Sequence, residues 1–557
     1  MKTLRIALAQ INPTVGDLRG NTEKIIEYIE KARTSGADVI AFPELSITGY
    51  PPEDLLLNAS FLKDNMICLK KIVPHTKGIT SIVGFVDARD NIYNGAAIIS
   101  NNKLIDVYHK ANFIRSSIFD EFKYFQKGEG YPLYNLDGVY FSMSIGDDIL
   151  HLKAHPGTKF IINIDASPYY IGGNIQKEKS ASQKAYENHA VLACVNMVGG
   201  QDEVVFNGES FIINEEGEII SRGTPFEEDL VVADLMYKQT NKASIDRKTK
   251  TINISFQLKQ KKKAVQEKIT KRLKPLEEIY KVLVLGVKDY VRKNGFKRVV
   301  LGLSGGIDSS LAALIAKDAI GKDSVTGIFM PSHYTSIESK EDAYQLAKNL
   351  NIKIIETPIA PLFRTYMNLF KTHFKNLPVD ITEENIQPRI RANILMAFSN
   401  KFGWLVLNSG NKSEIGTGYS TLYGDTAGGF AVLKDVSKTF VYKLAMWRNK
   451  KERYPLMPER VFKKAPSAEL KPDQKDTDTL PPYKILDPIL TAYIEDNKTI
   501  DELSAMGYDT RLVKEIMGMV DQSEYKRRQS PIGIKITKRS FGKDRTFPIT
   551  NKYRHKL

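Results

Sequence analysis

The stretch KRVVLGLSGGIDSS, residues 297–310, decides the fold of the second half of this 557-residue chain. Its apolar start is typical of a buried strand, and the residues after it, 311–321, read LAALIAKDAIG and predict a helix. A strand, a glycine-rich turn and a helix in this order place backbone N–H groups and the positive end of the helix around an anion. Gly305 and Gly306 allow a close approach of the backbone, so the stretch predicts a phosphate-binding loop.

The polar side chains of this loop fit a nucleotide. Three serines, Ser304, Ser309 and Ser310, supply hydroxyl donors. The carboxylate of Asp308 would repel a phosphate. It can bind Mg²⁺, which prefers oxygen ligands and can bridge the carboxylate to a phosphate. The Gly-Lys-Ser/Thr ending of a Walker A loop is missing. The alternative is a tight glycine turn that only caps a helix, and SGGIDS directly after an apolar strand favours the phosphate loop.

The rest of the second half repeats the pattern of strand and helix. Apolar segments at 324–330, 352–357 and 404–410 are expected strands, and the segments at 274–295, 336–350 and 389–403 are expected helices. Such a βαβ series predicts a parallel, doubly wound sheet.

The first half mixes many strands with interposed helices. Residues 4–11 and 38–44 are expected strands, and residues 21–36 are an expected helix. The pattern predicts a layered α/β domain over residues 1–240. Lysines and one arginine then crowd residues 259–274, which we interpret as a solvated linker rather than an anion-binding patch. We therefore expect a basic linker at 241–274 and a second domain at 275–557.

Composition narrows the class of protein. With 42% hydrophobic and 26% charged residues, the chain is neither disordered nor fibrous. The net charge of +15 fits an anionic substrate, a nucleic acid or a basic surface. Two cysteines, Cys68 and Cys194, exclude a disulfide scaffold and suit a reducing compartment.

The sequence also predicts where the protein lies in the cell. The apolar stretch in the first residues, MKTLRIALAQINP, is too short for a signal peptide. No apolar run is long enough to cross a bilayer. We therefore expect a cytoplasmic protein without a membrane partner.

SGGIDS is also the signature of the ATP-pyrophosphatase (PP-loop) family, which cleaves ATP between the α and β phosphates. Five further motifs, in order, resemble the NAD synthetases within that group. They are MPSHYTS at 330–336, ENIQPRIRANILM at 384–396, LNSGNKSEIGTGYSTLYGD at 407–425, KAPSAELKPDQKD at 464–476 and EYKRRQSPIGIKI at 524–536.

The resemblance implies an ATP-dependent carbon–nitrogen ligase with a Rossmann-like parallel sheet. The nicotinate carboxylate of deamido-NAD would attack the α-phosphate of ATP, pyrophosphate would leave, and ammonia would displace AMP from the adenylate. The partners implied are ATP, deamido-NAD, ammonia and a second copy of the chain, because family members assemble at least as dimers through this domain. Mg²⁺ would be held by Asp308 and Glu414.

The resemblance also assigns residues to each ligand. ATP would contact Gly302, Leu303, Ser304, Gly305, Gly306, Ile307, Asp308, Ser309, Ser409, Lys438 and Ser467. Deamido-NAD would contact Asn385, Arg391, Glu414, Tyr419, Ser420, Thr421, Leu422 and Lys526. Ser409 departs mildly from the threonine that is usual in the family, and it keeps the hydroxyl.

The first half resembles the nitrilase-like amidases, which are α/β/β/α sandwiches. In glutamine-dependent NAD synthetases this domain releases ammonia from glutamine with a Glu-Lys-Cys triad. Glu44 and Lys110 match the catalytic glutamate and lysine, but Gly146 stands where the family has the nucleophilic cysteine. The glutamine pocket is altered as well, in the loop 113–116 and near Gly173, where a basic side chain is expected.

No other nucleophile is evident in the sequence. Cys68 and Cys194 are expected to be buried and inert, and Ser142 and Ser144 have no matched base. We therefore predict a degenerate glutaminase domain fused to an NAD synthetase that uses free ammonia. The alternatives are a glutamine-dependent synthetase with an unusual nucleophile, an RNA-modifying PP-loop protein, and a scaffold without activity. Residues 275–557 contain no cysteine for tRNA thiolation, so we expect no nucleic-acid partner.

Overall fold

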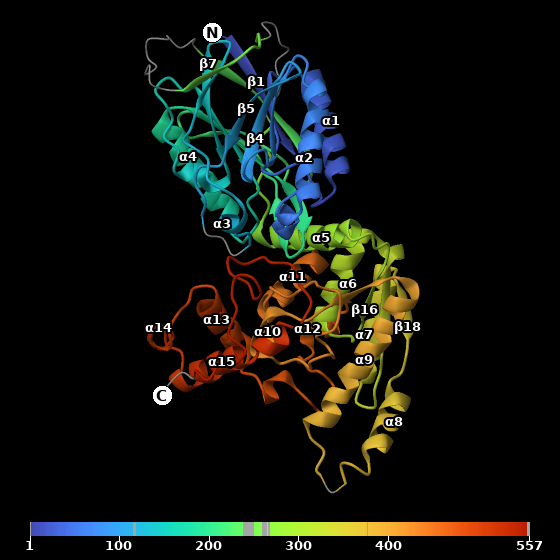
Figure 1. Ribbon diagram of the computed structural model, residues 1–557. Helices are drawn as coiled ribbons and strands as arrows, with labels where there is room; N and C mark the ends of the chain where they lie inside the picture. The colour runs from blue at the N-terminus through green and yellow to red at the C-terminus, as the bar shows by residue number, and fades with distance from the viewer. Residues whose placement is uncertain are drawn as a thin grey trace. The chain divides into compact units, whose positions relative to one another are not determined.

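The computed structural model describes residues 2–114, 118–237, 250–258, 265, 268–375 and 377–553 (Figure 1). The chain divides into two compact units. Unit 1 comprises residues 1–201 and 205–273, and unit 2 comprises residues 202–204 and 274–557. Lys259 and Lys261–Lys263 of the expected linker lie outside the described residues. Among the helices that are described, none has the length and apolar composition to cross a membrane.

Unit 1 contains two sheets that pack face to face. The first, in spatial order, consists of β14 (Asp229–Tyr237), β1 (Lys2–Gln10), β2 (Val39–Ala41), β3 (Thr80–Asp87), β4 (Tyr93–Ser100) and β5 (Lys103–His109). The second consists of β13 (Ile219–Arg222), β12 (Phe211–Ile213), β9 (Val191–Asn196), β8 (Phe160–Asp165), β7 (Val139–Ile145), β6 (Leu133–Leu136) and β15 (Thr251–Ile254). β10 (Val198–Gln201) pairs with β11 (Val204–Asn207).

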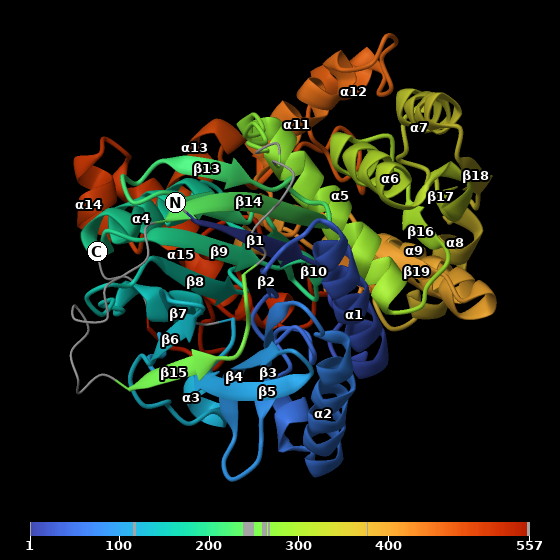
Figure 2. The ribbon, with the colours of Figure 1, turned by 90° about the horizontal axis from the view of Figure 1, so that it is seen from above.

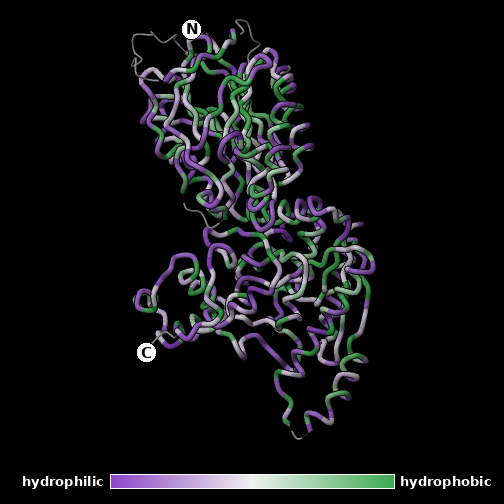
Figure 3. The backbone as a smooth tube through the Cα atoms, viewed as in Figure 1, coloured by the Kyte–Doolittle hydropathy of each residue, from purple (hydrophilic) through white to green (hydrophobic). Residues whose placement is uncertain are grey.

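Helices cover the outer faces of these sheets (Figure 2). α1 (Leu18–Thr34) and α2 (Ala59–Ile72) pack on the first sheet, and α4 (Gly173–Asn188) packs on the second. Side chains such as Leu8 and Phe141 form the core between the sheets. Figure 3 colours the backbone by hydropathy, with hydrophobic residues in green. The predicted α/β/β/α sandwich is confirmed. Its shorter elements are η1 (Glu53–Leu57), η2 (Val73–His75), α3 (Glu121–Tyr124) and η3 (Gly146–Leu150).

Unit 2 is built on a five-stranded sheet in which every pairing is parallel. The spatial order is β18 (Lys353–Glu356), β17 (Val325–Phe329), β16 (Val299–Gly302), β19 (Leu405–Asn408) and β20 (Phe430–Ala431). The strand order reverses between β16 and β19, and ligands of such sheets bind at this switch point, beyond the carboxyl ends of the strands. The predicted Rossmann-like sheet is confirmed.

The helices of unit 2 surround this sheet and extend beyond it. They are α5 (Pro275–Lys293), α6 (Ile307–Ile320), α7 (Ile337–Leu350), α8 (Ala360–Phe370), α9 (Ile381–Phe402), α10 (Lys412–Thr417), α11 (Lys438–Lys450), α12 (Glu459–Lys463), α13 (Tyr483–Ile494), α14 (Ile500–Ala505), α15 (Thr510–Gln522) and α16 (Glu524–Arg527), with the short helices η5 (Lys322–Ser324) and η6 (Asp476–Asp478).

Helix α9 begins eight residues earlier than the sequence predicts. The sequence pattern predicted a helix from 389, yet the helix begins at Ile381 and runs through Pro388. In a capping box, the Asp380 side chain accepts from the backbone N–H of Thr382, and the Glu383 side chain accepts from the backbone N–H of Asp380. Burial of Gln387, whose amide donates to the carbonyl oxygen of Leu470 at 2.8 Å, anchors the turn beside the proline. Tertiary contacts therefore outweigh the local cost of the proline.

Candidate active sites in the two units

The predicted phosphate loop lies at the switch point of the unit 2 sheet, between β16 and α6. Gly305 has a φ of +77°, and a Cβ atom there would lie 2.3 Å from the backbone oxygen of Ser339, so the position requires glycine. Ser304 and Ser309 share a hydroxyl–hydroxyl bond of 3.0 Å, and the Ser309 hydroxyl also accepts from the Ser304 N–H at 3.2 Å. These bonds hold the turn open toward the first turn of α6.

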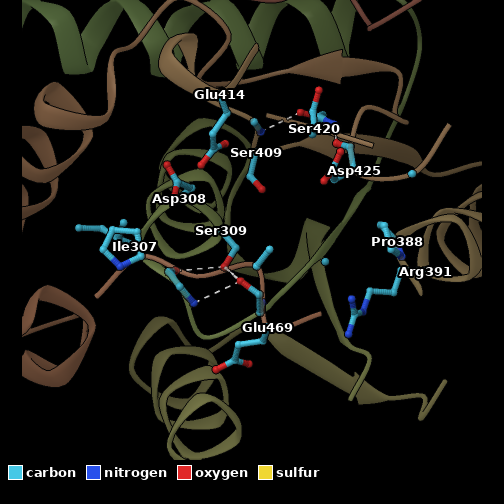
Figure 4. A pocket seen from close by; sticks show the side chains of 18 of the residues that line it. Ile307, Asp308, Ser309, Pro388, Arg391, Ser409, Glu414, Ser420, Asp425 and Glu469 are labelled. Carbon is cyan, nitrogen blue, oxygen red and sulfur yellow. Dashed lines mark hydrogen bonds between the residues drawn. The ribbon is translucent and has the colours of Figure 1, made fainter. Parts of the chain in front are cut away.

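A cavity of about 330 Å³ opens above this loop (Figure 4). Its lining contains every residue that the sequence assigned to ATP, together with Arg391, Glu414, Tyr419 and Ser420. Asn385, Thr421, Leu422 and Lys526 do not line it. They lie beside it: the Thr421 hydroxyl donates to Asn385 at 2.8 Å, and the Lys526 ammonium donates to the Ser420 carbonyl oxygen at 2.7 Å.

Within this cavity one lysine joins the two predicted metal ligands. The Lys438 Nζ lies 2.6 Å from Asp308 Oδ2 and 3.0 Å from Glu414 Oε1. Asn411 orients Asp308 through a 2.9 Å bond from its amide nitrogen. Burial raises the pKa of Glu414 to about 7, although Lys438 lowers it. Because both carboxylates converge on one cation, this pair of oxygen ligands fits Mg²⁺.

Four charged residues that line the cavity, Asp425, Lys464, Glu469 and Asp476, were not predicted from the sequence. Lys464 binds Glu469 at 2.5 Å, and its ammonium also donates to the Ser336 hydroxyl at 3.0 Å. Asp476 accepts from the Tyr483 hydroxyl at 2.7 Å. Lys464, Glu469 and Asp476 belong to the motif KAPSAELKPDQKD, which the sequence analysis identified. Of this motif, only Ser467 was assigned to a ligand.

Arg391 brings a further positive charge to the cavity from α9. Its Nε donates to the backbone oxygen of Met330 at 3.1 Å. Burial lowers the pKa of this guanidinium to about 10, while Glu469 and Asp425 raise it. Figure 4 shows the side chain extending from α9 toward the cavity. A guanidinium so placed is suited to a phosphate or a carboxylate of a ligand.

Unit 1 holds Glu44 and Lys110, which the resemblance assigned to the amidase triad, in a second buried cluster. The Lys110 Nζ lies 3.0 Å from Glu44 Oε1 and 2.7 Å from Glu121 Oε2. The Asn94 amide bridges both carboxylates, at 2.6 Å from Glu44 and 2.9 Å from Glu121. Burial raises the pKa of Glu44 to about 7, although Lys110 lowers it. Glu121 was missed because nothing local in the sequence links it to Lys110.

Gly146 lies directly beside this cluster, at the end of β7. A Cβ atom built on it would lie 3.0 Å from Lys110 Nζ and 3.1 Å from Glu44 Oε2. Its φ of +56° is a conformation that residues with side chains rarely adopt. Position 146 therefore presents backbone, and no nucleophilic atom, to Glu44 and Lys110. Nearby, Asp148 fixes the segment after Lys110 through the N–H groups of Ala111 and Asn112.

A cavity of about 350 Å³ adjoins Gly146 in unit 1. Lys177 of α4, one helical turn after Gly173, lines the cavity and binds Asp165 at 2.5 Å. Cys194 also lines it, and burial raises the pKa of this thiol to about 11. Both cysteines are buried, as predicted. In the altered loop 113–116, Arg115 and Ser116 lie outside the described residues.

Comparison with known proteins agrees with this two-unit organisation. Residues 5–243 match the carbon-nitrogen hydrolase family, and residues 278–530 match the NAD synthase family. The chain is 44% identical to the glutamine-dependent NAD(+) synthetase of Thermotoga maritima over the full length of both chains. It is 45% identical to the protein of the same name from Aquifex aeolicus, over 99% of this chain and 100% of that one. The chain belongs to the two-domain NAD synthetase family.

Solved structures agree with this assignment. The glutamine-dependent NAD⁺ synthetase of Acinetobacter baumannii, solved with ADP, matches with a TM-score of 0.75 at 39% identity over 99% of each chain. The enzyme of the same name from Cytophaga hutchinsonii matches with a TM-score of 0.83 at 20% identity, which supports the fold alone. The protein is thus an NAD synthetase, an ATP-dependent carbon–nitrogen ligase. The names of its relatives fit the glutamine-dependent alternative better than an ammonia-only enzyme.

Proposed function

We propose that this NAD synthetase amidates deamido-NAD with free ammonia, and that unit 1 hydrolyses no glutamine. The observation that carries the proposal is Gly146. Amide hydrolysis of the nitrilase type needs a nucleophile between the glutamate and the lysine. Glu44 and Lys110 remain in contact at 3.0 Å, but the residue beside them has no side chain. An acyl-enzyme cannot form on a glycine.

Glutamine dependence is the second candidate. It is favoured by the printed names of the relatives, which match this chain over both units. For this candidate another atom must attack the amide. Cys194 is the nearest thiol to consider because it lines the cavity beside Gly146, but burial raises its pKa to about 11, which leaves almost no thiolate at neutral pH.

In unit 2 we propose that the phosphate loop from Gly302 to Ser309, with Ser409, Lys438 and Ser467, binds ATP. All of these residues line one cavity. The relative from Acinetobacter baumannii, solved with ADP, supports a nucleotide site in this fold. Backbone N–H groups of the loop and the positive end of α6 bind the phosphates, and the Lys438 ammonium donates to them beside Asp308. Asp308 and Glu414 would hold Mg²⁺, which neutralises phosphate charge and so favours attack at the α-phosphorus.

Deamido-NAD is assigned to the residues on the α9 side of the cavity. Arg391, Glu414, Tyr419 and Ser420 line the cavity, and Asn385, Thr421, Leu422 and Lys526 lie behind them. In this arrangement the chain holds the two substrates side by side, which replaces a bimolecular encounter by an oriented one. Ammonia then attacks the adenylate, and no protein nucleophile takes part.

We also propose that unit 2 forms the homodimer that the family resemblance implies. None of the residues of α8 is buried, and apolar side chains near its end and at the start of α9 are exposed. They include Leu369 (64% exposed), Val379 (81%) and Ile381 (67%). An apolar surface of this kind favours burial against a second copy. Light scattering of the Leu369→Glu variant, expected to be monomeric beside an oligomeric parent, tests this assignment, and an unchanged mass would contradict it.

The division of the chain and its compartment are proposals as well. We propose a nitrilase-like domain at 1–240, a linker at 241–274 and a synthetase domain at 275–557. The passage of the chain from unit 1 to unit 2 at Leu273–Lys274 supports the second boundary. Two free, buried cysteines support a reducing, cytoplasmic setting.

Comparison of the two nitrogen sources tests the proposed function. The full-length protein is incubated with ATP, Mg²⁺ and deamido-NAD, and with either ammonium chloride or L-glutamine. Formation of NAD, AMP and glutamate is then measured. We expect NAD and AMP in equal amounts with ammonium, and neither NAD nor glutamate above background with glutamine. Equal rates of NAD formation from both donors would reject the ammonia proposal in favour of the second candidate.

A further inference from the structure

Glu414 lies on a helix that is too short to fix its position alone. Helix α10 has six residues, and helices shorter than about 12 residues are marginal by themselves in water. A capping box between Asn411 and Glu414 fixes its N-terminal end. At the other end of a helix, the last carbonyl groups have no partner within the helix. The position of Glu414 therefore depends on the groups that bind these carbonyl oxygens.

Three side chains in and beside α16 donate to the C-terminal end of α10. Arg527 Nη1 donates to the carbonyl oxygen of Gly416 at 2.8 Å, and the Ser523 hydroxyl donates to that of Thr417 at 3.1 Å. The Lys526 ammonium donates at 2.7 Å to the carbonyl oxygen of the glycine that follows the helix. Three successive carbonyl groups are thus satisfied, two of them by cations, which the negative end of a helix favours.

The guanidinium of Arg527 is fixed by contacts on every side. The residue is 5% exposed. Its Nε donates to Glu524 at 2.9 Å, and its Nη2 donates to the carbonyl oxygen of Val520 at 2.6 Å. The centre of the guanidinium lies 4.5 Å from the centroid of the Phe541 ring. Arg527 is not among the described residues that line the cavity, so any effect on the reaction passes through α10.

The bond from Arg527 to Gly416 acts close to Glu414. Gly416 follows Glu414 by two residues, within the same turn of α10. A shift of this turn therefore moves the Glu414 carboxylate, which lies 3.0 Å from Lys438. Figure 4 shows the Glu414 and Asp308 side chains close together in the cavity. Mg²⁺ demands near-ideal octahedral geometry, so displacement of one oxygen ligand weakens its site.

We propose that Arg527 is a positioning residue for the synthetase reaction, because its bond to Gly416 holds Glu414 where Mg²⁺ is bound. The inference rests on the proposed function, which takes Glu414 as a Mg²⁺ ligand. Loss of the guanidinium should weaken the part of ATP binding that depends on Mg²⁺. It should leave the contacts between ATP and the phosphate loop unchanged, since those contacts do not pass through α10.

Calorimetry with the full-length protein tests this role. ATP is titrated without deamido-NAD, once with Mg²⁺ and once with EDTA. Arg527→Met is expected to weaken binding with Mg²⁺ by about tenfold or more and to leave binding with EDTA unchanged. Arg528→Met is the matched control, because Arg528 binds the same Glu524, at 2.7 Å, through an exposed side chain. It should bind ATP like the parent under both conditions.

A milder variant covers the case in which Arg527→Met does not fold. Ser523→Ala removes the hydroxyl that donates to Thr417 and should weaken binding with Mg²⁺ by about threefold. Binding by a folded Arg527→Met that is unchanged, or that weakens equally with Mg²⁺ and with EDTA, would overturn the inference. If Arg527→Met is unfolded, parent-like binding by Ser523→Ala would overturn it.

Glu414→Gln separates this failure from a failure of the proposed function. We expect Glu414→Gln to lose the difference between binding with Mg²⁺ and with EDTA. If it does so while Arg527→Met behaves like the parent, only the positioning role of Arg527 is rejected. If Glu414→Gln keeps the difference of the parent, the assignment of the metal ligand is rejected together with this inference.

Discussion

The two units of this NAD synthetase contain the same buried arrangement with different surroundings. In unit 2, Lys438 lies between Asp308 and Glu414, and in unit 1, Lys110 lies between Glu44 and Glu121. In both clusters burial raises the pKa of one glutamate to about 7. Unit 2 places its cluster against a glycine-rich loop with a helix end behind it, whereas unit 1 places its cluster against Gly146.

This difference shows that the charge network of a site can be present without its reactive group. Removal of a lysine from between two buried carboxylates leaves uncompensated charge, so a structural role alone is enough to retain the cluster whether or not chemistry occurs. Chemistry also requires the group that meets the substrate. We propose that unit 2 has this group in the phosphate loop. Unit 1 has kept the network and the cavity, and lacks the atom that would attack an amide.

The largest effect is expected from the unit 2 cluster. Asp308→Ala should reduce ATP-dependent pyrophosphate release by about a thousandfold or more, because it removes a proposed Mg²⁺ ligand and leaves Lys438 with one carboxylate. Asp323→Ala, an exposed aspartate after α6, is the control and should keep the parent rate. Near-normal pyrophosphate release by Asp308→Ala would show that the metal ligands are assigned wrongly.

The second prediction adds the missing atom to unit 1. Gly146→Cys places a Cβ about 3 Å from both Glu44 and Lys110, so the thiol should be activated and glutamate release should rise from background to a measurable rate. Gly146→Ala is the matched control, since it bears the same backbone strain without sulfur. If the new thiol is alkylated by iodoacetamide yet releases no glutamate, the altered pocket rather than the absent nucleophile limits unit 1.

The third prediction tests whether the unit 1 cluster is structural. Lys110→Met leaves Glu44 and Glu121 buried without their cation, which should cost about 3–5 kcal/mol of folding free energy. The first thermal unfolding transition of the full-length protein should therefore fall clearly. Lys103→Met, on the exposed edge of β5, should leave that transition in place. A transition of Lys110→Met at the parent temperature would argue against a structural role.

The smallest effect is a pH dependence from Glu44. Burial, opposed by Lys110, raises its pKa from 4.5 in the unfolded chain to about 7, so the folded state holds this proton more tightly. Its contribution to stability is complete below pH 4.5 and declines as the pH rises to about 7, by at most about 3 kcal/mol. Glu44→Gln cannot titrate and should lack this slope.

Urea unfolding at pH 5 and pH 8 measures the slope. The midpoint of Glu44→Gln relative to that of the parent should move upward between pH 5 and pH 8, because only the parent loses stability over this interval. Glu27→Gln, an exposed glutamate of α1, should follow the parent at both values. A constant difference between Glu44→Gln and the parent would contradict the raised pKa.

Most of the fold and much of the unit 2 site could be predicted because their signals are local. The phosphate loop is contiguous in the sequence, and its glycines and serines meet within one turn. Lys464 and Glu469 could have been found in a motif that had already been identified. Glu121 and Lys177 could not, since their partners Lys110 and Asp165 are joined to them only by the packing of separate elements.

The amino-acid sequence alone determined the order of strands and helices, the ligase chemistry of the second half and the glycine at position 146, because each depends on which residues follow one another. Only the tertiary structure decided that Lys438 joins Asp308 to Glu414 across more than 100 positions, and that a cavity lined by charged side chains lies beside Gly146. Contacts between distant segments form when those segments bury a shared core. Hydrophobic periodicity in the sequence indicates which face of a helix or strand is buried, but it does not indicate which side chains meet there.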